Sequence, residues 1–172
     1  MKILVGYSQL RPEVRAALDR HADGCDVIYH DCSASNEAYH EFLDEHWQIG
    51  LDLVVIEHDI VIDERVIPEF QACPKPWCGF GYEVGVGYGV YLGCTRFRRQ
   101  LLDAVPDAFD LVQQERQSGV PPKAWYRLDV RLDAVLREHD FEPHLHMPPV
   151  RHLNDVSKLA DPIPVYAAGK DV

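Results

Sequence analysis

The chain has no long apolar segment and no excess of basic residues. No apolar run approaches the roughly 18 residues needed to cross a bilayer. Residues 1–10, MKILVGYSQL, pass into polar sequence without a signal-peptide pattern, so we expect a cytoplasmic protein. Seventeen Lys and Arg against 28 Asp and Glu give a net charge of −11. This balance argues against a protein whose main affinity comes from neutralising nucleic-acid phosphates, although a nucleic-acid acceptor is not excluded.

Cysteine is sparse and odd in number. Five cysteines without a secretory pattern predict reduced thiols and no disulfide framework. Cys73 and Cys78 have a C-x4-C spacing that fits common zinc ribbons poorly, and no second pair follows them. This spacing favours a structural role for both residues, as small apolar side chains.

Arg96, Arg98 and Arg99 form the one dense cationic cluster of the sequence. Such a cluster could bind a small phosphorylated ligand, or it could flank the start of a helix. The pattern leaves both interpretations open.

Apolar strands alternate with amphipathic helices through the first half of the chain. With 172 residues, 47% of them hydrophobic, the chain can bury a sizeable core as one domain. The expected order is strand 2–7, a helix from Pro12 to Gly24, strand 25–30, helix 38–47, strand 53–56, helix 63–70, and strands within 77–84 and 86–94. This order predicts an α/β fold, Rossmann-like, with a mainly parallel sheet covered by helices on both faces.

The second half has fewer clear strands. A helix is expected to open at Thr95 and include residues 96–105, and the polar residues 113–122 predict a surface loop. Residues 125–138 give the strongest helical periodicity. The glycines of residues 79–89 recur without the spacing of a dinucleotide fingerprint, so this stretch is interpreted as strands joined by a loop, or as an active-site flap.

Acidic residues emerge where the most apolar strand ends. Residues 51–63, LDLVVIEHDIVID, contain a strand typical of one buried on both faces, and Glu57, His58 and Asp59 follow it directly. In open α/β sheets, ligands bind at the carboxyl ends of the strands. Carboxylates at this edge can hold a divalent cation or take part in acid/base chemistry.

Three histidines lie close together near the end of the chain. His144 and His146 alternate, so that on a strand they would point the same way, and His152 follows them. Imidazole nitrogens are good ligands for Mn²⁺ or Zn²⁺. Solvated or packed histidines are the commoner explanation of such a pair, but the carboxylates of residues 57–59 strengthen the metal interpretation.

Four segments together resemble nucleotide-sugar glycosyltransferases of the GT-A type. They are VVIEHDIV (54–61), LGCTRFRRQLL (92–102), WYRLDVRLDAVL (125–136) and HLHMPPVRH (144–152). The likeness is closest to small glycosyltransferase-like proteins of phages and actinobacteria, similar to glycosyltransferase family 2. It implies a domain over residues 1–154, followed by a C-terminal tail over 155–172.

The resemblance also implies a site. Glu57, His58 and Asp59 stand where the family has an acidic DxD-type motif that binds Mn²⁺ or Mg²⁺, and Asp59 is the safer ligand because Glu replaces the first Asp. His152 matches the family's late metal-binding histidine better than His144 or His146 does.

The remaining implied residues concern the base and the nucleotide. Asp129 matches the general base, but Leu128 stands where the family's preceding acid would be. Tyr7, Ser8 and Arg11 should approach the base and ribose of the nucleotide, with Glu57 and His58 also at the donor.

The resemblance therefore implies a metal-dependent, hexosyltransferase-like enzyme. It would move a sugar from a UDP- or GDP-sugar to a hydroxyl acceptor whose identity the sequence does not give. Two alternatives remain: a catalytically inactive module that binds a nucleotide or nucleotide sugar, and a nucleotide-sugar hydrolase or nucleotidyltransferase that uses the same metal and diphosphate.

Overall fold

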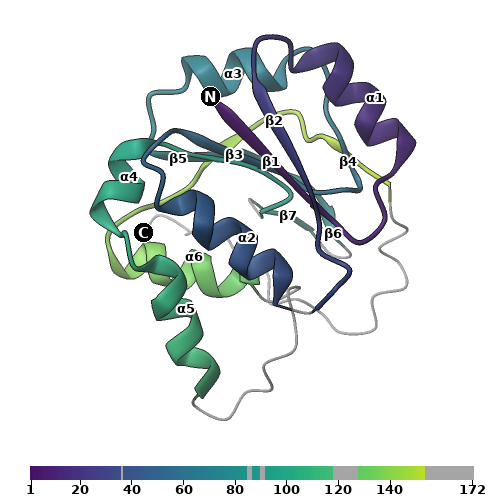
Figure 1. The fold of residues 1–172 in the computed structure, drawn as a ribbon. Helices are drawn as coiled ribbons and strands as arrows, with labels where there is room; N and C mark the ends of the chain where they lie inside the picture. The colour runs from purple at the N-terminus through teal and green to yellow at the C-terminus, as the bar shows by residue number, and fades with distance from the viewer. Residues whose placement is uncertain (36, 85–86, 90–91, 118–127, 154–172) are drawn as a thin grey trace.

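A six-stranded mixed sheet forms the centre of the protein (Figure 1). The computed structural model describes residues 1–35, 37–84, 87–89, 92–117 and 128–153. The sheet strands are β1 (Lys2–Tyr7), β2 (Asp26–Asp31), β3 (Leu53–Ile56), β5 (Trp77–Phe80), β8 (Cys94–Phe97) and β9 (His144–His146). Their spatial order is β2-β1-β3-β8-β5-β9, and β8 is antiparallel to both of its neighbours. The remaining pairings are parallel, which confirms the predicted α/β fold with a mainly parallel sheet.

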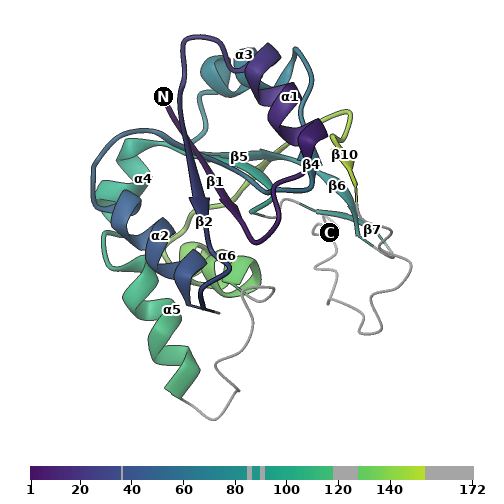
Figure 2. The same ribbon diagram turned by 45° about the vertical axis from the view of Figure 1, so that its right-hand side comes forward.

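Helices cover both faces of this sheet. They are α1 (Pro12–His21), α2 (Ala38–Trp47), α3 (Val66–Ala72), α4 (Arg99–Ala104), α5 (Ala108–Gln117) and α6 (Leu128–Glu138). Figures 1 and 2 show α1 and α3 on one face and α2, α5 and α6 on the other. No described helix is long and apolar enough to cross a membrane.

The two faces bury two separate cores because side chains alternate along each strand. On β1, Ile3 and Val5 pack with residues of α1 and α3, whereas Leu4 faces the other side. In the core that contains Leu4, the ring of Phe97 lies 5.1 Å from that of Trp47 and 5.9 Å from that of Trp77. Burying one such side chain contributes about 1.5–3 kcal/mol, so both helical layers are held firmly to the sheet.

The helix boundaries follow local sequence signals. Pro12 is the first residue of α1, where its missing N–H costs nothing. The Ser35 hydroxyl accepts a hydrogen bond from the backbone N–H of Ala38 at 3.1 Å, at the start of α2. Gly24 and Gly50 follow α1 and α2 with φ of 74° and 72°, a left-handed conformation that glycine adopts without strain.

Two small antiparallel ribbons lie at one end of the molecule, beyond the central sheet (Figure 2). One joins β4 (Ile60–Val61) to β10 (Arg151–His152), with His152 opposite Ile60. The other joins β6 (Tyr82–Val84) to β7 (Gly87–Gly89). Both ribbons follow strands of the main sheet, so they extend the carboxyl-terminal side of β3 and β5.

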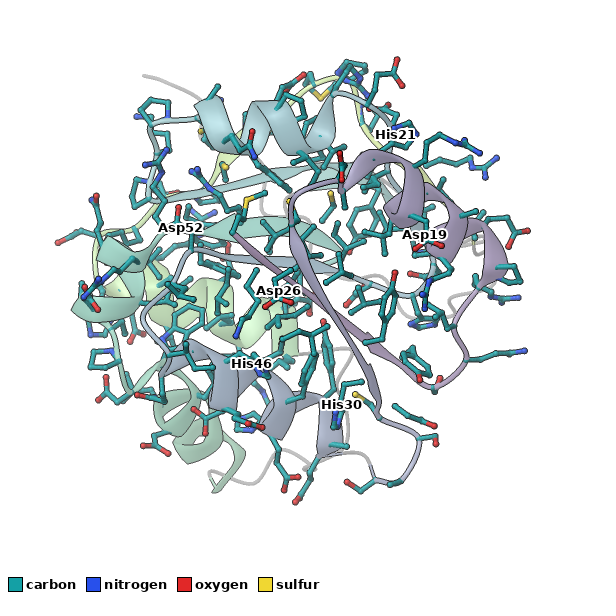
Figure 3. All side chains as sticks on the ribbon, turned by 45° about the horizontal axis from the view of Figure 1, so that its top comes forward. Asp19, His21, Asp26, His30, His46 and Asp52 are labelled. Atoms are coloured by element: carbon teal, nitrogen blue, oxygen red, sulfur yellow. The ribbon has the colours of Figure 1, made fainter. Side chains whose placement is uncertain are left out.

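The predicted helix opening at Thr95 is wrong, because residues 94–97 form β8 and α4 begins at Arg99. The carboxylate of Asp52, beside α4 in Figure 3, accepts the backbone N–H of Arg99 at 2.9 Å. Burial between β3 and β5 holds residues 94–97 extended despite the charge of Arg96.

The predicted loop over 113–122 is wrong for residues 113–117, which continue α5. Its remainder, the start of the predicted helix 125–138, and the tail 155–172 lie outside the described residues. The described part of that helix, α6, buries the expected face of Leu128, Leu132, Val135 and Leu136.

The outer strand β2 is the polar edge of the sheet. Asp26 and His30 lie along it in Figure 3, and most of the strand is only partly buried or exposed. The His30 ring stacks on Phe42 at 4.6 Å between centroids. Charged and polar side chains on an edge strand oppose pairing with another chain.

Candidate active site at the carboxyl ends of the strands

A cavity of about 400 Å³ lies where β1 and β2 end. It is lined by Gly6, Tyr7, Ser8, Cys32, Ser33, Ala34, Ser35 and Tyr39. A Cβ atom on Gly6 would lie 2.4 Å from Cδ2 of Tyr39, so the glycine allows the Tyr39 ring to approach the strand. The cavity sits at the edge of the sheet where ligands of open α/β folds bind, and it has room for a small molecule.

The acidic turn after β3 is anchored on both sides by backbone hydrogen bonds. The N–H of Glu57 donates to the carbonyl oxygen of Gly93 at 2.9 Å, and the N–H of Leu153 donates to that of Asp59 at 2.8 Å. Asp59 is 5% exposed. The sequence places the carboxylate here because β3 is buried on both faces and its first polar residues follow directly.

His152 meets Asp59 across the β4–β10 ribbon. Its Nε2 lies 3.4 Å from Oδ2 of Asp59, and its ring stacks on Tyr82 with centroids 5.2 Å apart and planes inclined by 4°. Tyr82 in turn lies against Gly93, where a Cβ atom would be 2.5 Å from the phenol oxygen. The late histidine and the turn after β3 are therefore brought into one site by tertiary structure.

Three carboxyl groups converge on this site. Burial is the largest cause that raises the pKa of Glu57, and the charges of Asp59 and Asp129 add to it. The nearby Tyr39 hydroxyl partly offsets the rise, and the resulting pKa is about 8. Burial also raises the pKa of Asp129 to about 6, although its carboxylate accepts the N–H of Val130 at 2.8 Å. Buried carboxyl groups with raised pKa values are a feature of sites that bind cations or transfer protons.

Two nitrogen-bearing side chains, those of Arg11 and His58, lie at the rim of the site. Burial lowers the pKa of His58, and the nearby charges of Arg11 and His152 lower it further, against the opposite effect of Asp59. Arg11 precedes the first turn of α1, where its carbonyl oxygen accepts the N–H groups of Val14 and Arg15. The start of α1 therefore brings a guanidinium towards the turn after β3.

The residues expected from sequence fall into two groups in space. Tyr7 and Ser8 line the cavity, Asp59 contacts His152, and Glu57 and Asp129 interact electrostatically. These placements agree with the expected geometry, while the roles of the residues stay predictions.

His144 and His146 belong to the second group. They lie on β9, three strands away from β3, and the described contacts of His146 are with other residues than Asp59. The fold therefore places His144 and His146 away from a metal at Asp59, because β9 pairs with β5 whereas β10 pairs with β4.

The arginine cluster flanks a helix start and is not an open anion site. Arg96 is 1% exposed, and its guanidinium donates to three main-chain carbonyl oxygens. Arg98 donates to the carbonyl oxygen of Cys73 at 2.6 Å, and Arg99 forms a salt bridge with Asp103 at 3.1 Å on α4. The structural interpretation of this cluster, as residues that flank the start of a helix, therefore holds for Arg96.

Several residues of the site were not singled out from sequence. Tyr39 and Tyr82 bring buried hydroxyl groups to the carboxylates, and burial raises both pKa values well above the usual range. The small polar run from Cys32 to Ser35 lines the cavity. That run directly follows a strand, at the edge where ligands bind, and this position was a signal that could have identified it.

The residues present fit a divalent cation. Asp59 offers a carboxylate and His152 an imidazole nitrogen in contact with it, and Glu57 adds a second carboxyl group nearby. A cation such as Mg²⁺ is usually held by one or two carboxylates together with waters and substrate phosphates. An incomplete protein ligand set beside a cavity therefore matches a site that is completed by a phosphorylated ligand.

The fold is similar to that of GT-A-like structures. The crystal structure of a glycosyltransferase involved in the glycosylation of the major capsid of PBCV-1 is similar to this chain with a TM-score of 0.55 and 13% identity, over 86% of this chain and 82% of that one. The structure of A197 from STIV is similar with a TM-score of 0.54 and 14% identity, over 90% and 86%. No family model and no curated protein sequence matches the chain.

Proposed function

We propose that this protein is a metal-dependent glycosyltransferase that moves a sugar from a nucleoside diphosphate sugar to a hydroxyl acceptor. The observation that carries the proposal is the convergence of Asp59, His152 and Asp129 on one edge of the sheet, beside a cavity of about 400 Å³. A GT-A-like fold supports it, because one of the similar structures is that of a glycosyltransferase.

Asp59, Glu57 and His152 are the residues that would hold Mn²⁺ or Mg²⁺. When bound, such an ion stabilises the negative charge that develops on the departing diphosphate. Tyr82 orients His152 by stacking on it, and the backbone bond from Leu153 to Asp59 keeps the two ligands in register. Glu57 has a pKa of about 8 and is mostly protonated at neutral pH, so it must lose a proton to act as an anionic ligand.

The cavity at the ends of β1 and β2 would hold the nucleoside. Tyr7 and Tyr39 offer ring faces, and Ser8, Ser33 and Ser35 offer hydroxyl groups for hydrogen bonds. The Arg11 guanidinium, at the neighbouring rim, is placed to meet the negative charge of the diphosphate, and the His58 ring beside it could form a hydrogen bond to the donor. These residue types suit a ligand with an aromatic base, a sugar and an anionic end.

Asp129 would remove the proton of the acceptor hydroxyl as its oxygen attacks the anomeric carbon. A general base works best when its pKa lies near the operating pH. Burial brings the pKa of Asp129 to about 6, so the carboxyl group is largely ionised at pH 7 and is a stronger base than an exposed Asp. The bond from the N–H of Val130 fixes one oxygen of the carboxylate.

The first test is thermal unfolding of metal-stripped protein with UDP, GDP, CDP and their common sugar conjugates, each with and without Mn²⁺. A ligand at about 100 times its dissociation constant stabilises the native state by about 2.7 kcal/mol. We expect one nucleotide to raise the midpoint only when Mn²⁺ is present, and the rise to disappear in His152→Ala. Arg151→Ala, on the same strand with an exposed side chain, is the matched control and should keep the rise.

The outcomes separate the proposal from its alternatives. A metal-dependent shift followed by sugar transfer to added acceptors supports the glycosyltransferase. A shift with no turnover of any donor would point to an inactive binding module, and release of free sugar into water to a hydrolase. No shift with any nucleotide, in protein shown to be folded, contradicts the nucleotide-sugar site itself.

A further inference from the structure

Two thiols and an imidazole meet between α3, β5 and β9, away from the turn after β3. Cys73 directly follows α3, Cys78 lies on β5, and His146 lies on the adjacent strand β9. The two Sγ atoms and a ring nitrogen of His146 all lie within 4.8 Å of one another. Cys73 is 5% exposed, Cys78 0% and His146 9%. A buried imidazole nitrogen needs a hydrogen-bond partner or another ligand, and two sulfur atoms lie close to this one.

The hydrogen bonding of His146 leaves one ring nitrogen for a ligand. Its Nδ1 lies 3.1 Å from Oε2 of Glu69, whereas its buried Nε2 has no hydrogen-bond partner among the described residues. In the neutral ring, Nδ1 is the nitrogen that donates its proton to the Glu69 carboxylate. The lone pair is then on Nε2. A histidine held by a carboxylate in this way is the usual arrangement of a metal ligand.

The surrounding backbone is held in place independently of any ligand. The carbonyl oxygen of Cys73 accepts hydrogen bonds from Arg96 at 3.1 Å and from Arg98 at 2.6 Å. The ring of His146 stacks on Phe80 with centroids 4.9 Å apart. Both ends of the cluster are therefore positioned by contacts that do not involve the thiols or Nε2.

A buried cation lies beside Cys78. Burial raises the pKa of Cys78 to about 12, but the adjacent Arg96 guanidinium acts in the opposite direction. Arg96 is itself 1% exposed and, among the described residues, its guanidinium bonds to neutral carbonyl oxygens. The guanidinium therefore offsets only part of the effect of burial on Cys78.

We propose that Sγ of Cys73, Sγ of Cys78 and Nε2 of His146 bind one Zn²⁺ ion. Two thiolates and an imidazole are the donors that Zn²⁺ prefers. With Zn–S bonds of about 2.3 Å, two sulfurs of a tetrahedral site are about 3.8 Å apart, so the cluster needs to contract by only about 1 Å. Binding releases one proton from each thiol and leaves a fourth position for water or for His144, whose ring lies 4.9 Å from that of His146.

This zinc site would stabilise the position of the edge strand β9. It would join the end of α3 to β5 and β9, and β9 leads within a few residues to β10 and His152. The site is chemically distinct from the carboxylate site and does not depend on the proposed transferase activity. Its effect on that activity would be indirect, through the position of His152.

The test is metal analysis and Co²⁺ substitution of the full chain purified under reducing conditions. We expect one Zn²⁺ per chain, and for Co²⁺ the intense visible bands of a tetrahedral ion together with thiolate-to-cobalt charge transfer. Each of Cys73→Ser and Cys78→Ser should remove about half of the charge-transfer intensity. Glu69→Gln keeps all three ligands but should weaken zinc affinity by about 10- to 100-fold.

Two controls keep the result specific. Cys94→Ala removes a buried thiol outside the cluster, and Asp59→Asn alters the carboxylate site; both should keep the charge-transfer band. Zinc should also raise the thermal midpoint of the wild type and of Cys94→Ala.

Two results on wild-type protein would overturn the proposal whether or not the variants fold. One is a Co²⁺ complex without thiolate charge transfer. The other is a Cys73–Cys78 disulfide found by mass spectrometry in protein purified with reductant.

Discussion

Two clusters of potential metal ligands in this protein differ in donor chemistry and in access. The site of Asp59 and His152 offers mainly oxygen donors and lies near a cavity of about 400 Å³. The site of Cys73, Cys78 and His146 offers mainly sulfur and is almost closed. Hard, open sites suit exchangeable Mg²⁺ or Mn²⁺ with a phosphorylated ligand, whereas soft, closed sites suit a resident Zn²⁺. The fold thus keeps the site proposed for catalysis apart from the site proposed for a structural metal ion.

Asp129→Asn should give the largest loss of activity at the open site. General-base catalysis contributes about 10²- to 10⁴-fold, so kcat should fall by that factor with little change in KM. Steady-state kinetics with the donor found by thermal shift measures it, and in the wild type kcat/KM should rise with pH around a midpoint near 6. The control is Asp133→Asn, one turn along α6, where the carboxylate is paired with Arg137 at 2.7 Å. Equal losses in both variants would refute the assigned base.

Asp59→Asn should separate the two clusters most directly. Loss of the anionic ligand should weaken Mn²⁺ affinity by at least about 100-fold, as measured by calorimetry, and excess Mn²⁺ should restore part of the activity. The cobalt–thiolate band should be unchanged. Asp63→Asn, just before α3 and paired with Arg65 at 2.7 Å, is the control for loss of a nearby acid. If Asp59→Asn retained full Mn²⁺ affinity, the metal would have to lie elsewhere.

The two sites should also differ in how metal affinity depends on pH. Below the Glu57 pKa of about 8, Mn²⁺ must displace one proton, so its affinity should rise by up to tenfold per pH unit between pH 6 and 8. Zn²⁺ must displace two thiol protons and should show a rise of up to 100-fold per unit. Glu57→Gln should flatten the Mn²⁺ profile and leave the Zn²⁺ profile steep. A steep Mn²⁺ profile in that variant would exclude Glu57 as the titrating group.

The free energy of unfolding of the metal-free protein should also depend on the protonation of Glu57. The folded state keeps the Glu57 proton up to about pH 8, while an unfolded chain releases it near 4.5. The folded state therefore binds more protons in this window, and the free energy of unfolding falls as pH rises from about 5 to 8, by at most about 1.4 kcal/mol per unit. Part of Glu57 is accessible to solvent, so the slope should be below that limit. Urea unfolding of wild type and Glu57→Gln measures the difference.

Gly6→Ala should give the smallest effect. The new methyl group would meet the Tyr39 ring, and overpacking of this kind costs about 1–3 kcal/mol. We expect the thermal midpoint to fall by several degrees and nucleotide binding to weaken with it, because both residues line the cavity. Gly24→Ala is the contrasting variant: its φ of 74° strains the backbone, but the site is remote from the cavity, so nucleotide binding should survive. Unchanged nucleotide affinity in Gly6→Ala would contradict the role of Tyr39 at the cavity.

Much of the layered fold could be predicted because its signals are local. The apolar run of β3, the proline at the start of α1 and the serine before α2 each act within one turn or strand. Predictions failed where packing opposed local pattern. The residues from Thr95 to Phe97 stand just before α4 and were predicted to begin that helix, yet burial between two strands holds them extended and buries the charge of Arg96. The polar end of α5 continues a helix that is anchored by Phe109 and Val112.

The sequence by itself determined the alternation of strands and helices, and it determined that Glu57, His58 and Asp59 follow a buried strand. These depend on neighbours in the chain. Only the tertiary structure decided which histidine meets which partner. His146 and His152 are close in sequence, but β9 pairs with β5 and β10 with β4, so one ring lies beside two thiols and the other beside Asp59. Strand pairing joins residues that are distant in the chain, and short local patterns carry no record of the chosen partner.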